Sequence, residues 1–303
     1  MLLGPHIKKE MFRHIVEENS EGETAGDKHS ILNHIKAAIK HGDDMDTIVG
    51  AAGIFVSGPR NHHLNITPDE AKDIHQFVNT FEGNYGRKFH LNAHGKYSDF
   101  MIWKEPTRYG ILSNECRLCD ACGIPDLVVH LPASPEETVH EAIKTMKRSW
   151  KVKLMLETPP VTPDKAFFNR PDQLQSLYSR LSPNIGLCVD SAHMWIGGSS
   201  FTGYDETMKW LELTRVALSK NRNPIMFHLN DSKRPFGTGP DEHETLAEGF
   251  IWNKIKNMEE SGIYAIMDFA QKYECPIILE RATLGGIESD YVLLAKYLEK
   301  PLQ

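Results

Sequence analysis

The chain has 303 residues, of which 40% are hydrophobic and 25% charged, a composition that is ordinary for a globular protein with a sizeable core. Its formal net charge of −7 speaks against a basic nucleic-acid-binding protein, but the sum leaves out any cations that the 15 histidines bind. No apolar run reaches the roughly 18 residues of a membrane span, and the N-terminus lacks the apolar segment of a signal peptide. We therefore expect an intracellular protein, cytoplasmic or nuclear, with no membrane partner.

Eight short apolar runs recur along the chain, and the segments between them carry helical patterns. In chain order the runs are 1–6, 53–60, 89–94, 126–130, 153–157, 186–190, 224–228 and 276–280. They are nearly continuous in apolar residues, which is typical of parallel strands covered on both faces. Eight such βα units favour an α/β fold with a closed (β/α)8 TIM barrel over a doubly wound sheet, in which nothing fixes the count at eight.

Helix start signals follow two of these runs. The segments "TPDE" from Thr67 and "SPEE" from Ser134 each combine an N-cap hydroxyl, a proline at the first helical position and an acidic residue at the third. Together with the apolar patterns further along, they predict helices at 68–81, 135–148, about 205–220 and about 262–272. The polar, glycine-bearing stretch 16–29 predicts a mobile surface loop within a single domain of residues 1–303.

The five cysteines do not predict a disulfide framework, because such frameworks need an oxidising compartment and usually a much smaller fold. The spacing of Cys116, Cys119 and Cys122 could hold part of an iron–sulfur cluster, but the fourth ligand and the following proline are missing. A helix that packs these small residues inward is favoured instead. Cys188 and Cys275 lie in or beside apolar runs and are expected to be structural.

The last six apolar runs share a feature that folding alone does not explain, since each ends on a residue type that binds metal. These residues are His94, His130, Glu157, Asp190, His228 and Glu280. In a TIM barrel the C-terminal strand ends converge on one face, where active sites are built, so the six side chains are expected to meet. A lone strand-end histidine is usually a hydrogen-bonded core or surface residue. Six in a row are improbable by chance, and several buried carboxylates need compensating cations.

Three further candidate ligands lie just beyond the strands. His193 ends "DSAH", and Asp241 and His243 belong to the stretch "MFHLNDSKRPFGTGPDEH". Alone, "GTGPDEH" has the composition of a polar turn, but its place above the cluster favours chelation by both side chains. The nine residues are five His, two Asp and two Glu, and such N/O ligands suit Zn²⁺ or Mn²⁺. Three ions at about three ligands each, with one carboxylate bridging, would leave open positions for water and substrate.

The motifs "LET", "CVDSAH", "FHLNDSK…G…DEH" and "ILE", in this order and at these spacings, resemble the endonuclease IV family, the metal-dependent apurinic/apyrimidinic (AP) endonucleases of base-excision DNA repair. The resemblance runs from His6 to Glu280, and "LETPP" and "ILERA" are more similar to the divergent members in large DNA viruses. It implies three zinc ions, with Mn²⁺ able to replace part of the zinc. The ligand sets it implies are His94, His130 and Glu157; Glu157, Asp190, His228 and Glu280; and His193, Asp241 and His243.

The resemblance also implies an activity, with Glu157 and Glu280 as catalytic residues that fix the separation of the ions. The reaction would be hydrolysis of the phosphodiester 5′ to an abasic site in duplex DNA, leaving a 3′-hydroxyl and a 5′-deoxyribose phosphate, together with 3′-phosphodiesterase activity on blocked 3′ ends. Arg60 and Tyr97 match positions that enter the DNA at the lesion in the family. The basic stretch with Lys233 and Arg234 is a candidate for phosphate contacts.

Two loops depart from the family pattern. Its arginine-bearing "GSRxDRH" is "GTGPDEH" here, and its "ENTAGQG" is "ETPPVTP", changes that keep the metal ligands but alter expected loop contacts to DNA. The alternative function is a single-metal sugar isomerase or epimerase of the same barrel type, which would use the second ligand set alone. A non-catalytic barrel that binds metal as a scaffold would have closed coordination. We expect a monomer, packaged in a virion if the chain is viral.

Overall fold

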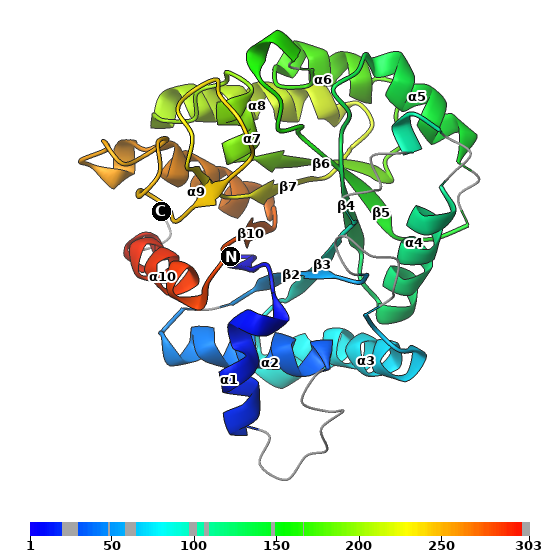
Figure 1. Cartoon of the computed structure of the whole chain (residues 1–303), viewed down its shortest axis with the longest axis vertical. Helices are drawn as coiled ribbons and strands as arrows, with labels where there is room; N and C mark the ends of the chain where they lie inside the picture. Colours follow the sequence, from blue (N-terminus) through cyan, green and yellow to red (C-terminus); the bar gives the residue numbers. More distant parts are fainter. Residues whose placement is uncertain are drawn as a thin grey trace.

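The computed structural model describes residues 1–19, 30–47, 49–57, 65–96, 102–105, 109–146, 149–165 and 167–298. Eight parallel strands form one sheet that curls into a nearly closed barrel with helices around it (Figure 1). The strands are β1 (Leu3–Pro5), β2 (Ala51–Phe55), β3 (His90–His94), β4 (Asp126–His130), β5 (Lys153–Glu157), β6 (Ile185–Asp190), β7 (Ile225–His228) and β10 (Ile277–Leu279). The predicted TIM barrel and its eight strands are confirmed.

The barrel strands lie in the order β1-β10-β7-β6-β5-β4-β3-β2. The parallel register places His130 opposite Glu157, and Asp190 opposite His228. The two outer strands of this order meet through a parallel bridge between His6 and Gly53. Gly53 has no room for a side chain, because a Cβ there would lie 2.8 Å from Cδ2 of His6. The sheet therefore closes on itself, and its strand ends face a common centre.

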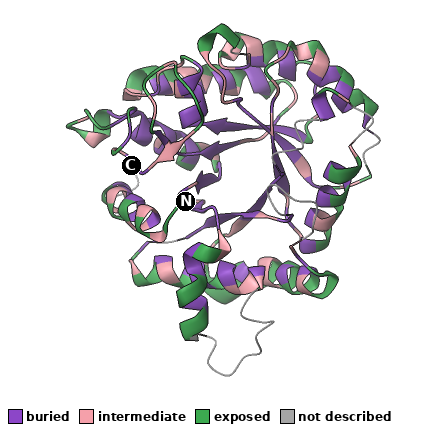
Figure 2. Cartoon of the chain, in the orientation of Figure 1, coloured by how far each residue is buried: buried purple, intermediate pink, exposed green. Residues whose placement is uncertain are grey.

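Helices cover the outside of the barrel, and their buried sides face the strands (Figure 2). They are α1 (Lys9–Asn19), α2 (Ile31–Asp44), α3 (Pro68–Tyr85), α4 (Gly110–Cys122), α5 (Glu136–Thr145), α6 (Pro171–Tyr178), α7 (Ser191–Ile196), α8 (Tyr204–Ser219), α9 (Gly262–Tyr273) and α10 (Leu284–Leu298). A small antiparallel hairpin of β8 (Asp231–Ser232) and β9 (His243–Glu244) follows β7. Within the described ranges, no helix combines the length and apolarity that crossing a membrane requires.

Of the two predicted N-caps, Thr67 is confirmed and Ser134 is wrong. Thr67 caps α3, because its hydroxyl accepts the N–H of Glu70 at 3.2 Å. Ser134 does not cap α5, which begins at Glu136 after Pro135 and without a side-chain cap. The predicted loop 16–29 is also partly wrong. Its first four residues, 16–19, belong to helix α1, which continues to Asn19. Residues 20–29 lie outside the described ranges.

The cysteines behave as small buried side chains. Cys116, Cys119 and Cys122 lie buried in α4, as the i, i+3 and i+6 spacing predicted. Cys188 is buried in β6, and Cys275 is buried just before β10. All five are free thiols. Burial raises the pKa of Cys122 to about 12, so that this group stays a neutral thiol at pH 7.

Candidate metal centre

The predicted strand-end residues meet at the carboxyl ends of the barrel strands. Five of them end β3 to β7, and the sixth directly follows β10: His94, His130, Glu157, Asp190, His228 and Glu280. Glu157 lies at their centre with none of its surface exposed. Its Oε2 is 3.3 Å from Nε2 of His94 and 2.8 Å from Nε2 of His130, while its Oε1 is 2.7 Å from Nδ1 of His228. One carboxylate thus joins side chains from both sides of its strand.

The remaining three candidates come from α7 and the β8–β9 hairpin. Asp190 caps α7, because its Oδ1 accepts the N–H of His193 at 2.9 Å, and this cap turns the chain so that His193 faces the cluster. The hairpin brings in Asp241 and His243. The Asp241 carboxylate lies 3.2 Å from Nε2 of His193 and 3.0 Å from Nε2 of His243. All nine predicted residues therefore lie together.

Main-chain carbonyls orient two of the imidazole rings. Nδ1 of His94 is 2.6 Å from the carbonyl oxygen of Gly95, and Nδ1 of His193 is 2.7 Å from that of Thr158. A carbonyl oxygen only accepts, so each Nδ1 carries the hydrogen and donates it. In the neutral ring, the lone pair then belongs to Nε2, which points toward the carboxylates. This is the arrangement in which protein histidines bind metal.

The geometry yields several groups of ligand atoms that lie within 4.8 Å of one another. Two of them coincide with sets implied by the family resemblance: His94, His130 and Glu157, and Glu157, Asp190, His228 and Glu280. A third contains Asp190, His193 and His243, with Asp241 beside both histidines. A further group adds Cys188 to Glu157 and His228, a proximity that the sequence did not reveal. Burial raises the pKa of the Cys188 thiol to about 12.

Charge in the cluster is balanced between carboxylates and imidazoles. Burial raises the pKa of Glu157, but the neighbouring His130 and His228 outweigh it and hold that pKa well below its ordinary value. Burial lowers the pKa of His193, but the negative charges of Asp190 and Asp241 outweigh it and hold that pKa well above its ordinary value. Without a bound cation, protons on the imidazoles therefore provide the positive charge.

Several buried atoms of the cluster make no hydrogen bond of ordinary geometry. They include Oε2 of Glu157, Nε2 of His193 and Nε2 of His243. Buried polar atoms are nearly always paired, and unpaired ones need an explanation. These atoms are electron-pair donors that converge on shared points, which is what divalent cations bind. The residues present therefore fit the metal ions that the sequence predicts.

The predicted DNA-contact residues are less fully described. Arg60 and Tyr97 lie outside the described ranges. Lys233 and Arg234 lie on the β8–β9 hairpin beside the cluster, where Lys233 forms an ion pair with Glu244 at 3.8 Å and Arg234 forms one with Glu242. The positive charge of each basic side chain is thus balanced by a neighbouring carboxylate.

Sequence reasoning missed two buried residues beside the cluster. His6 follows β1 just as the ligands follow their strands, and its ring centroid is 6.1 Å from that of His94. Burial lowers its pKa to about 3, so it is a neutral imidazole. The same strand-end signal could have found it. Asn230 hydrogen-bonds to two candidate ligands, but amides carry no metal-ligand signal in a sequence.

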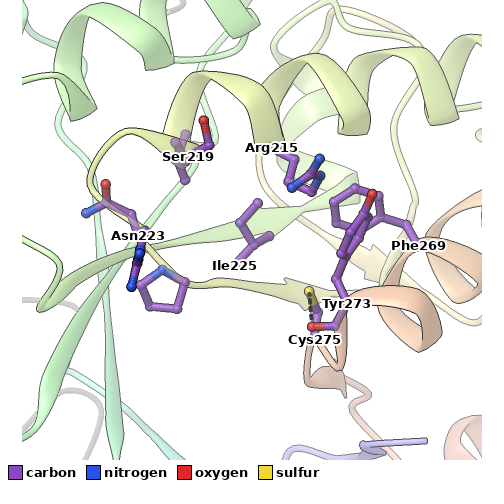
Figure 3. Close-up of a pocket in the computed structure, with 10 residues that line it drawn as sticks. Arg215, Ser219, Asn223, Ile225, Phe269, Tyr273 and Cys275 are labelled. Carbon is purple, nitrogen blue, oxygen red and sulfur yellow. Dashed lines mark hydrogen bonds between the residues drawn. The ribbon is translucent and has the colours of Figure 1, made fainter.

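A cavity lies at the end of the barrel opposite the candidate ligands, where β7 begins (Figure 3). This cavity of about 330 Å³ is lined by residues from α8, α9, the start of β7 and the loops before β7 and β10, among them Arg215, Asn223, Ile225 and Tyr273. The ten described residues around it include neither a histidine nor a carboxylate. It therefore has no part in the metal centre.

The fold is a TIM barrel whose strands carry candidate metal ligands at their carboxyl ends. The family model described as xylose isomerase-like TIM barrel matches residues 49–282, and the chain belongs to this family.

Individual proteins that the chain is similar to are AP endonucleases and endonuclease 4 proteins by name. The probable AP endonuclease of African swine fever virus is 29% identical over 275 residues, 88% of this chain and 90% of that relative. The probable endonuclease 4 of Nitrosopumilus maritimus is 28% identical over 75% of this chain and 82% of its own length. The crystal structure of AsfvAP:AG gives a TM-score of 0.84 at 26% identity and covers 98% of this chain and 99% of that one. The predicted resemblance to endonuclease IV and its viral members is confirmed.

Proposed function

We propose that the chain is a metal-dependent AP endonuclease that binds duplex DNA and hydrolyses the phosphodiester 5′ to an abasic site, with 3′-phosphodiesterase activity on blocked 3′ ends. The products would be a 3′-hydroxyl and a 5′-deoxyribose phosphate. The observation that carries the proposal is the meeting of nine N/O ligand residues at the carboxyl ends of the barrel strands. The names of the viral and archaeal relatives support the same class of enzyme.

Each ligand group has its own role in this reaction. Bound zinc ions would neutralise the phosphodiester, lower the pKa of water and stabilise the leaving oxygen. Glu157 contacts histidines on both of its oxygens, so it is placed to bridge two ions and fix their separation. Glu280 lies beside the same nitrogen of His228, with its Oε2 3.5 Å from Nδ1, and completes the second set. His193 in α7 would hold the third ion together with Asp241 and His243 of the β8–β9 hairpin.

Selectivity for an abasic site needs no reading of bases. A nucleotide without its base has lost stacking and pairing, so rotating it out of the duplex costs least there. Arg60 and Tyr97 would fill the gap that is left, and Lys233 and Arg234 would contact phosphates after release from their acidic partners. Such phosphate contacts would position the strand without reading its sequence, since they fix register and orientation.

A single-metal sugar isomerase would use the set of Glu157, Asp190, His228 and Glu280. It would leave unused five further metal-ligating residues that gather at the same site, namely His94, His130, His193, Asp241 and His243. The endonuclease accounts for all nine, and we therefore prefer it.

The decisive experiment combines metal analysis with an incision assay. The purified protein should contain about three divalent ions per chain, with zinc foremost. It should cut a duplex that carries one abasic site and leave the undamaged duplex intact, and chelation followed by zinc should abolish and restore cutting. One ion per chain together with no incision would contradict the proposal and favour the isomerase.

A further inference from the structure

Asn230 lies two residues beyond the end of β7, and none of its surface is exposed. Its Nδ2 donates to Oδ2 of Asp190 at 2.6 Å and to Oε2 of Glu280 at 3.2 Å. Asp190 ends β6 and Glu280 follows β10, the two strands on either side of β7. One amide group therefore connects two candidate ligands that belong to different strands.

The orientation of this amide is determined by its other end. Its Oδ1 accepts the main-chain N–H of Glu280 at 3.1 Å and Nη1 of Arg281 at 2.7 Å. Guanidinium and main-chain N–H groups can only donate, so the carbonyl oxygen must face them and the NH2 group must face the carboxylates. Both hydrogens and both lone pairs of the Asn230 side chain are thus in use. In a flipped amide, the NH2 group would face the N–H groups of Glu280 and Arg281, and the carbonyl oxygen would face the two carboxylates.

Arg281 is itself fixed by buried partners. Only 3% of its surface is exposed, and its Nη2 donates to the carbonyl oxygen of Leu229 at 3.0 Å. Its Nε lies 2.6 Å from Oδ2 of Asp290 in α10. The other carboxylate oxygen of Asp290 accepts the N–H of Leu246 at 2.9 Å, in the segment that follows β9. A continuous chain of polar contacts therefore runs from α10 to the two candidate ligands.

We propose that Asn230 is a positioning residue of the metal centre. Its NH2 group holds the carboxylates of Asp190 and Glu280 at the separation from which both reach the ion they share with Glu157 and His228, and Arg281 keeps the amide facing them. The inference rests on the proposed metal centre and deepens it. Loss of such a partner leaves ligands free to turn away, and typically lowers metal affinity about 10- to 100-fold.

The chain supplies a matched control at the opposite end of the same strand. Asn223 precedes β7, is buried, and its Nδ2 donates to the carbonyl oxygens of Ser182 at 2.8 Å and Ile185 at 2.6 Å. It borders the cavity drawn in Figure 3, at the barrel end that bears no candidate ligands among its described residues. Asn223→Leu therefore removes a buried amide with two donated hydrogen bonds, as Asn230→Leu does, without touching the metal centre.

The test measures zinc binding of the full-length protein without reference to catalysis. Zinc affinity by chelator competition and the rate of zinc release to a chromogenic chelator are compared in the wild type, Asn230→Leu and Asn223→Leu. We expect the affinity for at least one ion to fall about 10- to 100-fold in Asn230→Leu and to stay at the wild-type value in Asn223→Leu. Both variants should lower the melting temperature in excess chelator, whereas only Asn230→Leu should reduce the rise in melting temperature that zinc produces.

Asn230→Ser covers the case in which Asn230→Leu does not fold. Its single hydroxyl hydrogen can serve at most one of the two carboxylates, so zinc affinity should still fall. Wild-type zinc affinity and release in a folded Asn230 variant would overturn the inference, and so would an equal loss in Asn223→Leu. A wild-type protein that binds no zinc would instead overturn the proposed metal centre, so the two failures are distinguishable.

Discussion

Asp190 and His193 each use one side-chain atom to contact the backbone and another to face the candidate metal centre. Oδ1 of Asp190 caps α7, while Oδ2 faces the cluster, 2.6 Å from Nδ2 of Asn230 and 3.7 Å from Nε2 of His243. His193 likewise uses Nδ1 to contact the main chain and Nε2 to face Asp241. Because one atom of each side chain is tied to the backbone, the other has a fixed direction. Such preorganised ligands need little rearrangement when they bind an ion.

His243 separates the endonuclease from the isomerase, because only the endonuclease gives it a role. The third ion would keep only His193 and Asp241 in His243→Ala, and loss of one electrostatic element at a reacting phosphate commonly costs about 100-fold or more in rate. We therefore expect incision of an abasic-site duplex to drop by at least that factor and the metal content to fall by about one ion per chain. Single-turnover assays and elemental analysis measure both.

The matched control for this change is His14→Ala, which removes an exposed histidine of α1. It should leave metal content and incision unchanged. The His243→Ala protein should remain folded, with a stability loss of about 1 kcal/mol, since the barrel core is not altered. Undiminished incision by a folded His243→Ala variant would remove this residue from the site and break the three-ion assignment.

Zinc binding should release protons near neutral pH. Burial lowers the pKa of His94, but the Glu157 carboxylate beside it outweighs burial and raises that pKa above its ordinary value; the pKa of His193 is raised as well. Zinc binds the neutral imidazole, so these protons must leave. Titration with zinc in a weakly buffered indicator solution should show about one or more protons released per chain. No proton release at pH 7 would contradict the assigned ligands.

The raised pKa values of His94 and His193 also determine how the stabilisation by zinc depends on pH. A histidine whose pKa is raised by folding stabilises the cation-free protein below about pH 6.5, and this contribution is lost as the pH rises through the folded-state pKa. Zinc supplies positive charge without protons, so its stabilising effect grows over that window. The zinc-induced rise in melting temperature should therefore be larger at about pH 8 than at about pH 6.

At the scale of secondary-structure elements, the strands could be predicted and several connections could not. The strands form near-continuous apolar runs, and the last residues of these runs are the six strand-end candidate ligands. α7 was missed because it has only six residues and begins without a loop, and its N-cap signal, Asp190, is also a candidate ligand. The two-residue strands β8 and β9 are too short for any alternation to be detected. The contacts of His6 and Asn230 exist only once distant strands are neighbours.

The segment 232–251, which includes the β8–β9 hairpin, is held by one buried carboxylate. Oδ1 of Asp231 accepts the N–H groups of Ser232 at 2.7 Å and Ile251 at 2.9 Å, and its Oδ2 accepts that of Gly249 at 3.2 Å. Gly249 must be glycine for this approach, because a Cβ there would lie 2.5 Å from Oδ1 of Asp231. The carboxylate therefore anchors both ends of the segment that carries Asp241 and His243.

Asp231→Asn should consequently be costly although it conserves shape. The amide has one accepting oxygen in place of two, so its NH2 group must oppose at least one buried N–H, and an unsatisfied buried donor costs about 1–3 kcal/mol. Urea denaturation should show a loss of that size. Asp172→Asn is the control, because Asp172 forms an exposed ion pair with Arg170, and such surface pairs contribute little to stability. Equal losses in the two variants would contradict the anchoring role.

At the scale of the whole molecule, the two ends of the barrel differ in chemistry. The carboxyl ends of the strands carry the candidate ligands, whereas the amino end of β7 borders a cavity with two arginines, Arg215 and Arg222, and apolar walls. The chain as a whole carries a net charge of −7, which repels DNA at long range. Bound zinc ions would reverse the sign of the charge locally, at the face where DNA must approach.

DNA binding should for that reason depend on both metal and salt. Each phosphate neutralised releases counterions and contributes about 0.9 to the slope of log affinity against log salt. We expect zinc-loaded protein to bind an abasic-site duplex with a steep slope, and zinc removal to weaken binding at every salt concentration. The abasic duplex should bind more tightly than the intact duplex at every salt concentration, because the proposed contacts of Arg60 and Tyr97 inside the lesion release no counterions and add affinity without changing the slope. Fluorescence anisotropy measures each curve.

A double change of Arg60 and Tyr97 to Ala tests the lesion contacts directly. Metal content should be unchanged, since neither residue is a candidate ligand, while the preference for abasic over intact DNA should disappear. Equal affinity of the wild type for intact and abasic duplexes at all salt concentrations would contradict the lesion-reading role of these two positions.

The strand order bears on when the proposed metal centre can form during synthesis and folding. β10, which precedes Glu280, pairs with β7 on one side and with the N-terminal β1 on the other, so the last strand is also the one that joins the two halves of the chain. A nascent chain that has been synthesised only as far as His228 lacks Asn230, Asp241, His243 and Glu280. Contacts this distant in sequence form late and slowly in folding. The second and third ions would therefore enter only after synthesis and barrel closure, and their binding should slow unfolding without speeding the folding of the chain.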